Sequence, residues 1–396
     1  MNMFHQVKLG NVITLQRGFD ITKSAQSDGD VPIVSSSGIA SFHDKWKVKG
    51  PGVIIGRKGT LGTVHFVRSN FWPHDTTLWV KDFKGNSPIF LRYFLRTLKL
   101  ENFDVGASNP TLNRNHVHKI KVIFPKSVDT QRRVAAILST YDELVENNNQ
   151  HIALLEKMAE DIYREWFVRL RFPGYENTTI AKGVPQGWQR KGLSSLGTYL
   201  NGYAFKPKDW GLEGKPIIKI KEMTSGVTTE TPRNSGDDVP ARYHFDDGTL
   251  IFSWSATLLV MIWNQGHGLL NQHLFKVDPA PGIPKSFLYF SIKFSIPIFE
   301  SLTTGATMQH IKRKELGIVK VNLPPAELLA RFDSLISPIL EQILSLTTAN
   351  RKLIQTLDGL LPRLISGNLS VEDLDIQFPP GMVEELNGEQ TGAPRA

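Results

Sequence analysis

The chain contains two copies of one segment, and this internal repeat constrains the fold more than any other feature of the sequence. Five pairs of segments match in the same order: those around Gly18 and Gly202, around Pro32 and Pro216, from Gly52 and Gly248, from Gly106 and Gly305, and ending at Pro125 and Pro324. The separation between matched residues grows from 184 through 196 to 199. Insertions explain this growth, mainly the stretch at residues 224–238. The repeat predicts two domains of the same kind in tandem.

Each copy has the pattern of a mixed α/β domain. Short runs rich in β-branched and aromatic residues are bounded by glycine, proline and aspartate turns, which predicts strands at residues 53–55, 63–67, 78–80, 119–124 and 217–220. Apolar residues three and four apart predict one helix per copy, at residues 89–98 and 286–294. The most apolar window, residues 250–263, is too short to span a bilayer, so we expect buried strand there and no membrane contact.

A long helical pattern follows each copy. Its apolar stripe after the first copy comprises Val134, Ile137, Tyr141, Leu144, Asn148, Ile152, Leu155, Ala159, Ile162 and Trp166. The stripe after the second copy comprises Phe332, Leu335, Ile339, Leu346, Asn350, Leu353, Leu357, Leu360 and Leu364. Stripes with this spacing need a partner helix, and a polar residue on them, such as Asn148 or Asn350, typically fixes the register.

Together these patterns predict an α+β chain in which two tandem mixed α/β domains are separated and followed by long helices that pack as an antiparallel coiled coil. The expected parts are a first domain at residues 1–128, a central helix at 129–172, a second domain at 173–324 and a C-terminal helix at 325–369. Residues 370–396 are acidic and contain a Pro-Pro-Gly sequence, so we expect a disordered tail.

Positive charge is concentrated in the two copies. Residues 1–128 contain 18 Lys and Arg against 8 Asp and Glu, and residues 173–324 contain 17 against 12. The segments that follow them are acidic, with 6 against 8 in residues 129–172 and 5 against 10 in residues 325–396. This alternation predicts two modules that face a polyanion, joined by elements that face something else.

Cysteine is absent from the chain, which excludes disulfides, cysteine nucleophiles and zinc sites with cysteine ligands. The first residues lack the basic region and apolar stretch of a signal peptide. We therefore expect a cytoplasmic location.

Three strings resemble the specificity subunits of Type I restriction-modification systems. They are the helix that begins DTQRRVAAIL at Asp129, the segment VPQGWQRKGLSSLG at Val184 and the segment LLPRLISGNL at Leu360. In that family a helix ending in a Trp-Phe pair leads into a second recognition domain that opens with Pro-x-Gly-Trp. Here the pair is Trp166 and Phe167, and the opening is Pro185, Gly187 and Trp188. The resemblance extends from residue 7 to about residue 369.

The resemblance implies a non-catalytic subunit that reads a bipartite, asymmetric DNA target with one half per domain. It implies double-stranded DNA, two methyltransferase subunits recruited through the helices, and motor-nuclease subunits as partners. S-adenosylmethionine, ATP and magnesium would be bound by those partners, and no cofactor or metal by this chain. Residues 169–171, Arg-Leu-Arg, replace the Asp-rich run that the family has after the Trp-Phe pair, which leaves the contacts at this helix end open.

Motifs for phosphate binding or adenine methylation are missing from the sequence. The closest approach to the Asn-Pro-Pro-aromatic motif of adenine methylation is at Asn109, which lacks the second proline and the ring. Gly56, Gly59 and Gly62 do not match a phosphate-binding loop and predict a tight turn.

Two further groups of residues give only weak indications of nuclease or metal chemistry. Asp209, Glu213 and Lys215 faintly resemble a nuclease set, but the two acids are too close together for the usual hairpin. His116 and His118, expected at the entry to a strand, would face opposite sides and make a poor metal pair.

Loop residues that can hydrogen-bond to bases or phosphates are the candidate DNA contacts. Arg and Asn match the edges of guanine and adenine, whereas Lys mostly meets phosphate. In the first copy these candidates are Arg57, Lys58, Asn113, Arg114 and His116. In the second copy they are Gln309, His310, Lys312 and Arg313, with Trp254 and His273 as weaker ones. Candidates for helix packing or partner binding are Asn148, Leu155, Trp166, Phe167, Asn350, Leu353 and Leu357.

Two other functions are alternatives to a DNA-reading subunit. A restriction enzyme with its own methyltransferase or nuclease activity is disfavoured, because the methylation motif and a stretch long enough for a catalytic domain are both missing. A coiled-coil adaptor that binds only protein is disfavoured by the basic repeats.

Overall fold

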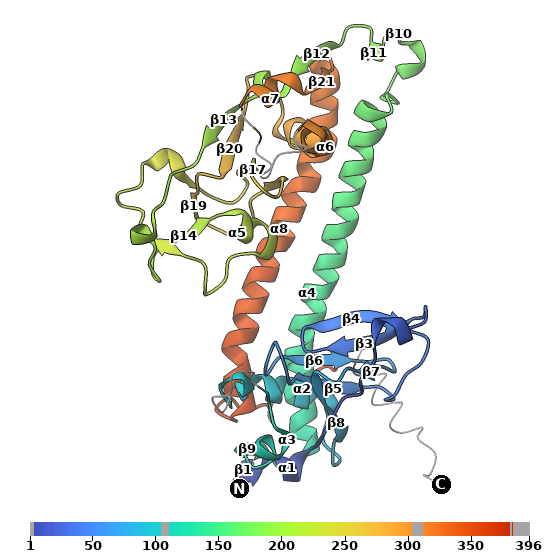
Figure 1. Cartoon of the computed structure of the whole chain (residues 1–396), viewed down its shortest axis with the longest axis vertical. Coiled ribbons are helices and arrows are strands. Elements are labelled where there is room, and N and C mark those ends of the chain that lie inside the picture. The colour runs from blue at the N-terminus through green and yellow to red at the C-terminus, as the bar shows by residue number, and fades with distance from the viewer. Residues whose placement is uncertain (1–3, 104–110, 303–310, 312, 381, 383–396) are drawn as a thin grey trace. The chain divides into compact units, whose positions relative to one another are not determined.

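The computed structural model describes residues 4–103, 111–302, 311, 313–380 and 382 (Figure 1). It divides into two compact units, residues 1–145 with 353–396, and residues 146–352. Each unit therefore combines one domain with part of each long helix. No helix in the described part of the chain is both long and apolar enough to cross a membrane.

The two long helices are α4, Val128–Tyr163, and α8, Ala326–Ile365 (Figure 1). A π-helical turn, Arg164–Val168, continues α4. In the second unit the helices run antiparallel, because the ring of Trp166 lies 5.9 Å from that of Phe332 while Asn148 bonds to Asn350 at the other end. The predicted pair of long packed helices is confirmed.

Two positions of the predicted stripes are wrong. Leu144 and Leu335 are 44% and 46% exposed, whereas Ile336 is fully buried. An α-helix turns 3.6 residues per turn, so a stripe written with strict spacing drifts off the buried face.

The described residues of the first domain form three small sheets and three α-helices. Strand β1 (Phe4–Lys8) pairs with β9 (Lys121–Pro125). The second sheet has the order β2 (Thr14–Arg17), β8 (Thr77–Asp82), β5 (Gly52–Gly56) and β6 (Val64–Val67). The third has the order β4 (Gly38–His43), β3 (Val31–Ser35) and β7 (Trp72–Pro73). The helices are α1 (Leu9–Val12), α2 (Pro88–Thr97) and α3 (Arg114–Val117).

Local sequence explains how α2 starts and why it is buried. The Ser87 side chain accepts a hydrogen bond from the backbone N–H of Phe90, and Pro88 occupies the first helical turn, where its missing N–H costs nothing. Phe90 and Phe94 then pack edge-on against Phe124 of β9, with ring centroids 5.6 and 4.9 Å apart. This contact joins the helix to the first hydrophobic core.

The second domain repeats this plan with additional turns. Strand β12 (Gln189–Gly192) pairs with β21 (Lys320–Leu323). One four-stranded sheet has the order β13 (Gly197–Asn201), β20 (Leu274–Pro279), β17 (Leu250–Ser253) and β18 (Leu259–Ile262). The other sheet has the order β15 (Arg233–Asn234), β14 (Lys215–Ile218), β19 (Gly268–Leu270) and β16 (His244–Phe245). Strands β10 (Ile180–Ala181) and β11 (Val184–Pro185) form a hairpin at the entry. The helices are α5 (Ile220–Ser225), α6 (Lys285–Leu302) and α7 (Arg313–Ile318).

Matching backbone hydrogen bonds show that the two domains are copies. Each of the following bonds of the first domain has its counterpart in the second: Gly18 N to Thr77 O and Gly202 N to Leu274 O; His74 N to Val34 O and Asn271 N to Ile218 O; Leu112 N to Arg57 O and Ile311 N to Trp254 O. The strand pairing corrects one sequence match by a residue. Val80 of β8 pairs with β2 in the same way that Val277 of β20 pairs with β13, so these two residues are equivalent and lie 197 apart in the sequence. Strands β5 and β17 pair with β8 and β20, so their equivalent residues are also 197 apart, and not 196 as the sequence match indicated.

The segment after α8 is ordered where it is described, contrary to the disorder that we expected from residue 370 onward. Val371 and Met382 are each 2% exposed and belong to the first hydrophobic core. Arg133 of α4 also donates a hydrogen bond to the backbone oxygen of Leu374 at 3.1 Å. Apolar residues scattered through an acidic segment were enough to attach it to the first domain.

Candidate nucleic-acid interface

One edge of the four-stranded sheet in the first domain gathers charged side chains from three strand ends. Strand β2 ends at Arg17, β5 ends immediately before Arg57 and Lys58, and β8 begins two residues after Asp75. The three strands pair antiparallel in the order β2, β8, β5, so these ends meet at the same edge. Arg57 and Lys58, both predicted from the sequence, therefore lie beside Arg17 and Asp75, which were not.

Asp75 is the centre of this cluster. Its Oδ2 accepts a hydrogen bond from Arg17 at 2.8 Å and lies 3.9 Å from the ammonium group of Lys58. Its backbone oxygen accepts from Arg57 at 3.5 Å. The Asp75 side chain is 17% exposed, while that of Arg17 is 53% exposed. Half-buried Asp75 thus contacts three cationic side chains, Arg17 and Lys58 through its carboxylate and Arg57 through its backbone oxygen.

The cluster keeps its charges at neutral pH. Burial by itself would raise the pKa of Asp75, but the hydrogen bond from Arg17 and the charges of His74 and Lys58 lower that pKa below its ordinary value. Burial and the neighbouring charge of Arg17 lower the pKa of Arg57, which nevertheless stays cationic because an arginine starts far above neutrality.

The loop before α3 brings the other candidates of the first copy to the same edge. Leu112 N donates to Arg57 O at 3.0 Å, and Lys58 forms an isolated bridge with Thr111. Asn113 follows directly, and its side chain caps α3 by accepting from the N–H of Asn115 at 2.9 Å. The interpretation of Asn113 as a free base contact therefore competes with its role as a helix cap. Arg114 and His116 are exposed on α3.

The two histidines that we expected at the entry to a strand lie instead at the short helix α3. His116 lies within the short helix α3 and His118 follows its last residue. The Nε2 of His118 accepts a hydrogen bond from the backbone N–H of Leu15 at 2.9 Å. Burial lowers the pKa of His118, and the charges of Arg114 and Lys84 lower it further. This histidine is a neutral structural acceptor that ties α3 to β2.

The equivalent edge of the second domain has a different set of side chains. Trp254 takes the place of Arg57, and its Nε1 donates to Oδ1 of Asn201 at 2.9 Å, where Asn201 takes the place of Arg17. The ring of His273 lies 5.8 Å from that of Trp254. Arg313, at the start of α7, donates to the backbone oxygen of Tyr199 at 3.3 Å. The other candidates predicted here, Gln309, His310 and Lys312, lie outside the described residues.

The helix candidates fall into three environments. Asn350 is 6% exposed and accepts a hydrogen bond from Asn148 at 2.8 Å. Trp166 and Phe167 pack in the second hydrophobic core, where Phe167 lies 5.9 Å from Trp188. Leu357 is buried in the first core, while Leu155 and Leu353 are half-buried. The Arg-Leu-Arg segment is tied back to this helix end, because Arg171 N donates to Glu165 O at 2.7 Å.

Asp209, the first residue of the weak nuclease set, has a structural role. Asp209 Oδ2 accepts from the backbone N–H of Lys206 at 2.7 Å and so caps a short turn. Gly59 and Gly62 have φ of +76° and +72° in the turn between β5 and β6, as the tight-turn interpretation requires.

Among the described residues, Asp20, His74 and Asp75 form a group whose ligand atoms lie within 4.8 Å of one another. Because Asp75 already accepts from Arg17, a metal ion there would lie against a guanidinium group, and we assign no metal to this group.

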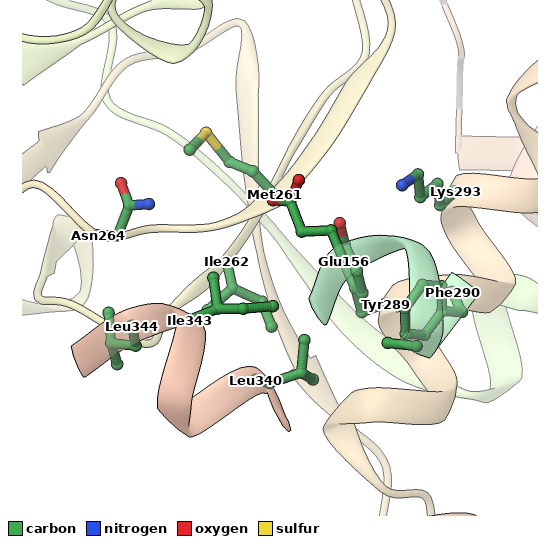
Figure 2. Close-up of a pocket in the computed structure, with 11 residues that line it drawn as sticks. Glu156, Met261, Ile262, Asn264, Tyr289, Phe290, Lys293, Leu340, Ile343 and Leu344 are labelled. Atoms are coloured by element: carbon green, nitrogen blue, oxygen red, sulfur yellow. The ribbon is translucent and has the colours of Figure 1, made fainter. Parts of the chain in front are cut away.

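A small cavity of about 100 Å³ lies in the second unit among α4, α6, α8 and β18 (Figure 2). Its wall combines apolar side chains of α8, including Leu340 and Leu344, with Tyr289 and Lys293 of α6. Lys293 is already paired with Glu160 at 2.7 Å. The cavity is a packing space between helices, and we assign no ligand to it.

Comparisons with known proteins agree with this geometry. Residues 1–157 and 185–358 match the family model described as the Type I restriction modification DNA specificity domain. The chain is 26% identical to the Type I restriction enzyme MjaIX specificity subunit of Methanocaldococcus jannaschii over 72% of this chain and 70% of that protein. It is 21% identical to the Type I restriction enzyme HindI specificity subunit of Haemophilus influenzae over 66% of this chain and 71% of that protein.

A solved structure also shares the fold. The S subunit of a Type I restriction-modification system from M. genitalium superposes with a TM-score of 0.61, covering 92% of this chain and 96% of that chain at 14% identity. The predicted fold class is thereby confirmed.

Proposed function

The chain belongs to the family of Type I restriction modification DNA specificity domains, and from this premise we propose that it reads a bipartite DNA target with one half per domain. The family role is DNA sequence recognition without catalysis. In the proposal, the sheet edge that carries Arg17, Arg57 and Asp75 meets one half-site, and the edge that carries Asn201 and Trp254 meets the other.

The observation that carries the proposal is the contrast between equal backbones and unequal side chains. The hydrogen bonds that position Arg57 and Trp254 are the same in both copies, yet one residue is a cation and the other an indole. Two domains with the same backbone but different side chains at the DNA-facing positions can recognise two different base sequences. A target with unequal halves follows from this difference.

Partner subunits would supply the chemistry. We expect two methyltransferase subunits that bind S-adenosylmethionine, and motor-nuclease subunits that use ATP and magnesium, all acting on DNA in the cytoplasm. Leu154 and Met158, which are 60% and 53% exposed one turn apart on α4, provide an apolar surface on which a protein partner can pack. No cofactor is assigned to this chain.

The test is to co-express the chain with the methyltransferase subunit encoded beside it and to map methylated adenines across a genome by long-read sequencing. The expected result is one motif of two fixed halves separated by a nonspecific gap. Methylation without sequence preference from a well-formed complex would overturn the proposal and favour an adaptor that binds only protein.

A matched pair of variants assigns each half to a domain. Arg57→Ala should change base preference in one half only, and Trp254→Ala in the other half only. Changes by both variants in the same half would contradict one half-site per domain.

A further inference from the structure

We infer that Arg17, held in place by Asp75, reads a guanine in the half-site of the first domain. This inference rests on the proposed function and extends it to one residue and one base. Arg17 is the last residue of β2, and its terminal nitrogen donates to Asp75 Oδ2 at 2.8 Å. Neither residue was singled out by the sequence patterns.

The Arg17 side chain combines exposure with restraint. It is 53% exposed, while the carboxylate that holds it is 17% exposed. A guanidinium group has five N–H donors in a planar fork, and the described hydrogen bonds of Arg17 use it toward Asp75 alone, which leaves donors for a ligand. An arginine already fixed in one rotamer loses less conformational entropy when it binds.

The two carboxylates beside Arg17, those of Asp75 and Asp20, favour a base over a phosphate as its partner. The carboxylate of Asp75 lies against the guanidinium group and offsets part of its charge, and Asp20 lies in the same group of side chains. A phosphate would be repelled by these carboxylates, whereas the edge of a base is neutral. Lys58, 3.9 Å from Asp75 and 40% exposed, is better suited to meet phosphate at this edge.

Hydrogen-bond geometry selects guanine among the bases. In the major groove guanine presents two acceptors, O6 and N7, which match two parallel donors of an arginine. Adenine presents only N7 and thymine only O4 as an acceptor there, and cytosine presents only an amino donor, so none of them matches two donors of Arg17. An open groove beside Arg17, lined by Phe19, Lys47 and Trp72, leaves room for a ligand at this position.

The second copy provides the comparison that isolates this residue. Asn201 holds the place of Arg17, and Gln272 holds the place of Asp75, because both pairs follow the separations of 184 and 197 that the backbone bonds establish. Asn201 accepts from Trp254 at 2.9 Å. The pair of an arginine with an aspartate at these two positions is therefore present in the first domain and absent from the second.

The experiment measures binding of the purified complex of this chain with its methyltransferase subunit to short DNA duplexes. The wild-type target is compared with duplexes in which each base pair of both halves is replaced in turn. Arg17→Ala and Arg17→Lys are expected to reduce discrimination at one guanine of one half-site by about 5- to 150-fold, the range of one bidentate contact, while preferences in the other half stay unchanged. Asp75→Asn should weaken discrimination at the same guanine.

Two controls accompany these variants. Asn201→Ala should act only in the opposite half, and Arg96→Ala, an exposed arginine of α2, should act at neither half. Circular dichroism of Arg17→Lys checks that the fold is kept.

The inference is overturned if Arg17→Lys folds and keeps every base preference, or if both Arg17 variants weaken binding equally on all duplexes with a smaller salt dependence, as a phosphate contact would. A wild-type complex with no base preference at all would overturn the proposed function, and the inference with it.

Discussion

Asn148 donates a hydrogen bond from its side-chain amide to Oδ1 of Asn350 at 2.8 Å, and Asn350 donates in turn to Asn149 at 2.9 Å. Asn350 is 6% exposed, so its side-chain amide is buried between α4 and α8 within the second unit. The buried amide of Asn350 meets both of these partners when the helices pack in this register. We interpret the pair as the determinant of that register.

Asn350→Leu is expected to lower the free energy of unfolding of the second unit by about 1–3 kcal/mol, because the half-buried amide of Asn148 loses its partner. Urea denaturation followed by circular dichroism measures the change. The double variant Asn148→Leu with Asn350→Leu should recover much of the loss by apolar packing. Additive losses in this double-mutant cycle would contradict the coupling.

Gly18→Ala and Gly202→Ala should each disrupt, in their own domain, the sheet edge that carries the candidate DNA contacts. A Cβ atom at either position would lie 2.1 Å from a backbone oxygen, that of His74 or that of Asn271. Since backbone cannot yield as a flexible side chain can, we expect a loss of about 2 kcal/mol or more from each substitution. Thermal unfolding measures it, and equal stability of wild type and variant would show that the strands separate at no cost.

Gly359→Ala is expected to stabilise the protein by about 1 kcal/mol. Gly359 lies within α8, and a Cβ atom there would have no neighbour within 4 Å. Alanine loses less backbone entropy than glycine when a helix forms. A raised midpoint of thermal unfolding is the expected result, and a lowered midpoint would mean that the helix needs flexibility at this position.

Mild acid should destabilise the first unit through His118. Its pKa in the folded chain lies below the ordinary value of 6.5, so the unfolded chain binds this proton more readily. Stability is therefore full above about pH 6.5 and falls as the pH drops from there toward the folded pKa. The measurement is the unfolding midpoint in urea between pH 7.5 and 5.

His118→Gln is the matched variant, because a glutamine can still accept from Leu15 N–H but does not titrate. Its stability should depend less on pH across this range than that of the wild type. An unchanged pH profile would assign the effect to other groups.

Much of the architecture could be predicted from short-range patterns. The match of Gly18 with Gly202 predicted a duplication, and the structure supplies its reason, since both glycines lie against backbone oxygens. The Trp166 and Phe167 pair marked the end of the central helix through the family resemblance, and in the structure Phe167 lies 5.9 Å from Trp188. Patterns of this kind are visible in sequence because burial and close backbone contact restrict residue type at every copy.

The charged cluster at the sheet edge of the first domain was predicted only in part. Arg57 and Lys58 stood out in a glycine-rich turn, but Arg17 and Asp75 are 58 residues apart and belong to no motif. His118 was expected at the entry to a strand, and its role as an acceptor could not be predicted because it depends on Leu15, 103 residues away. The drift of the apolar stripe at Leu335 likewise became visible only when α4 was packed beside α8.

The sequence by itself determined the duplication, the alternation of domains with long helices and the basic character of the two copies, because each of these follows from residues that are neighbours in the chain or that repeat along it. Only the tertiary structure decided which side chains share an edge, which acid holds which arginine and which asparagines pair. Those relationships are formed by strand pairing and helix packing over long separations, and no local preference encodes them.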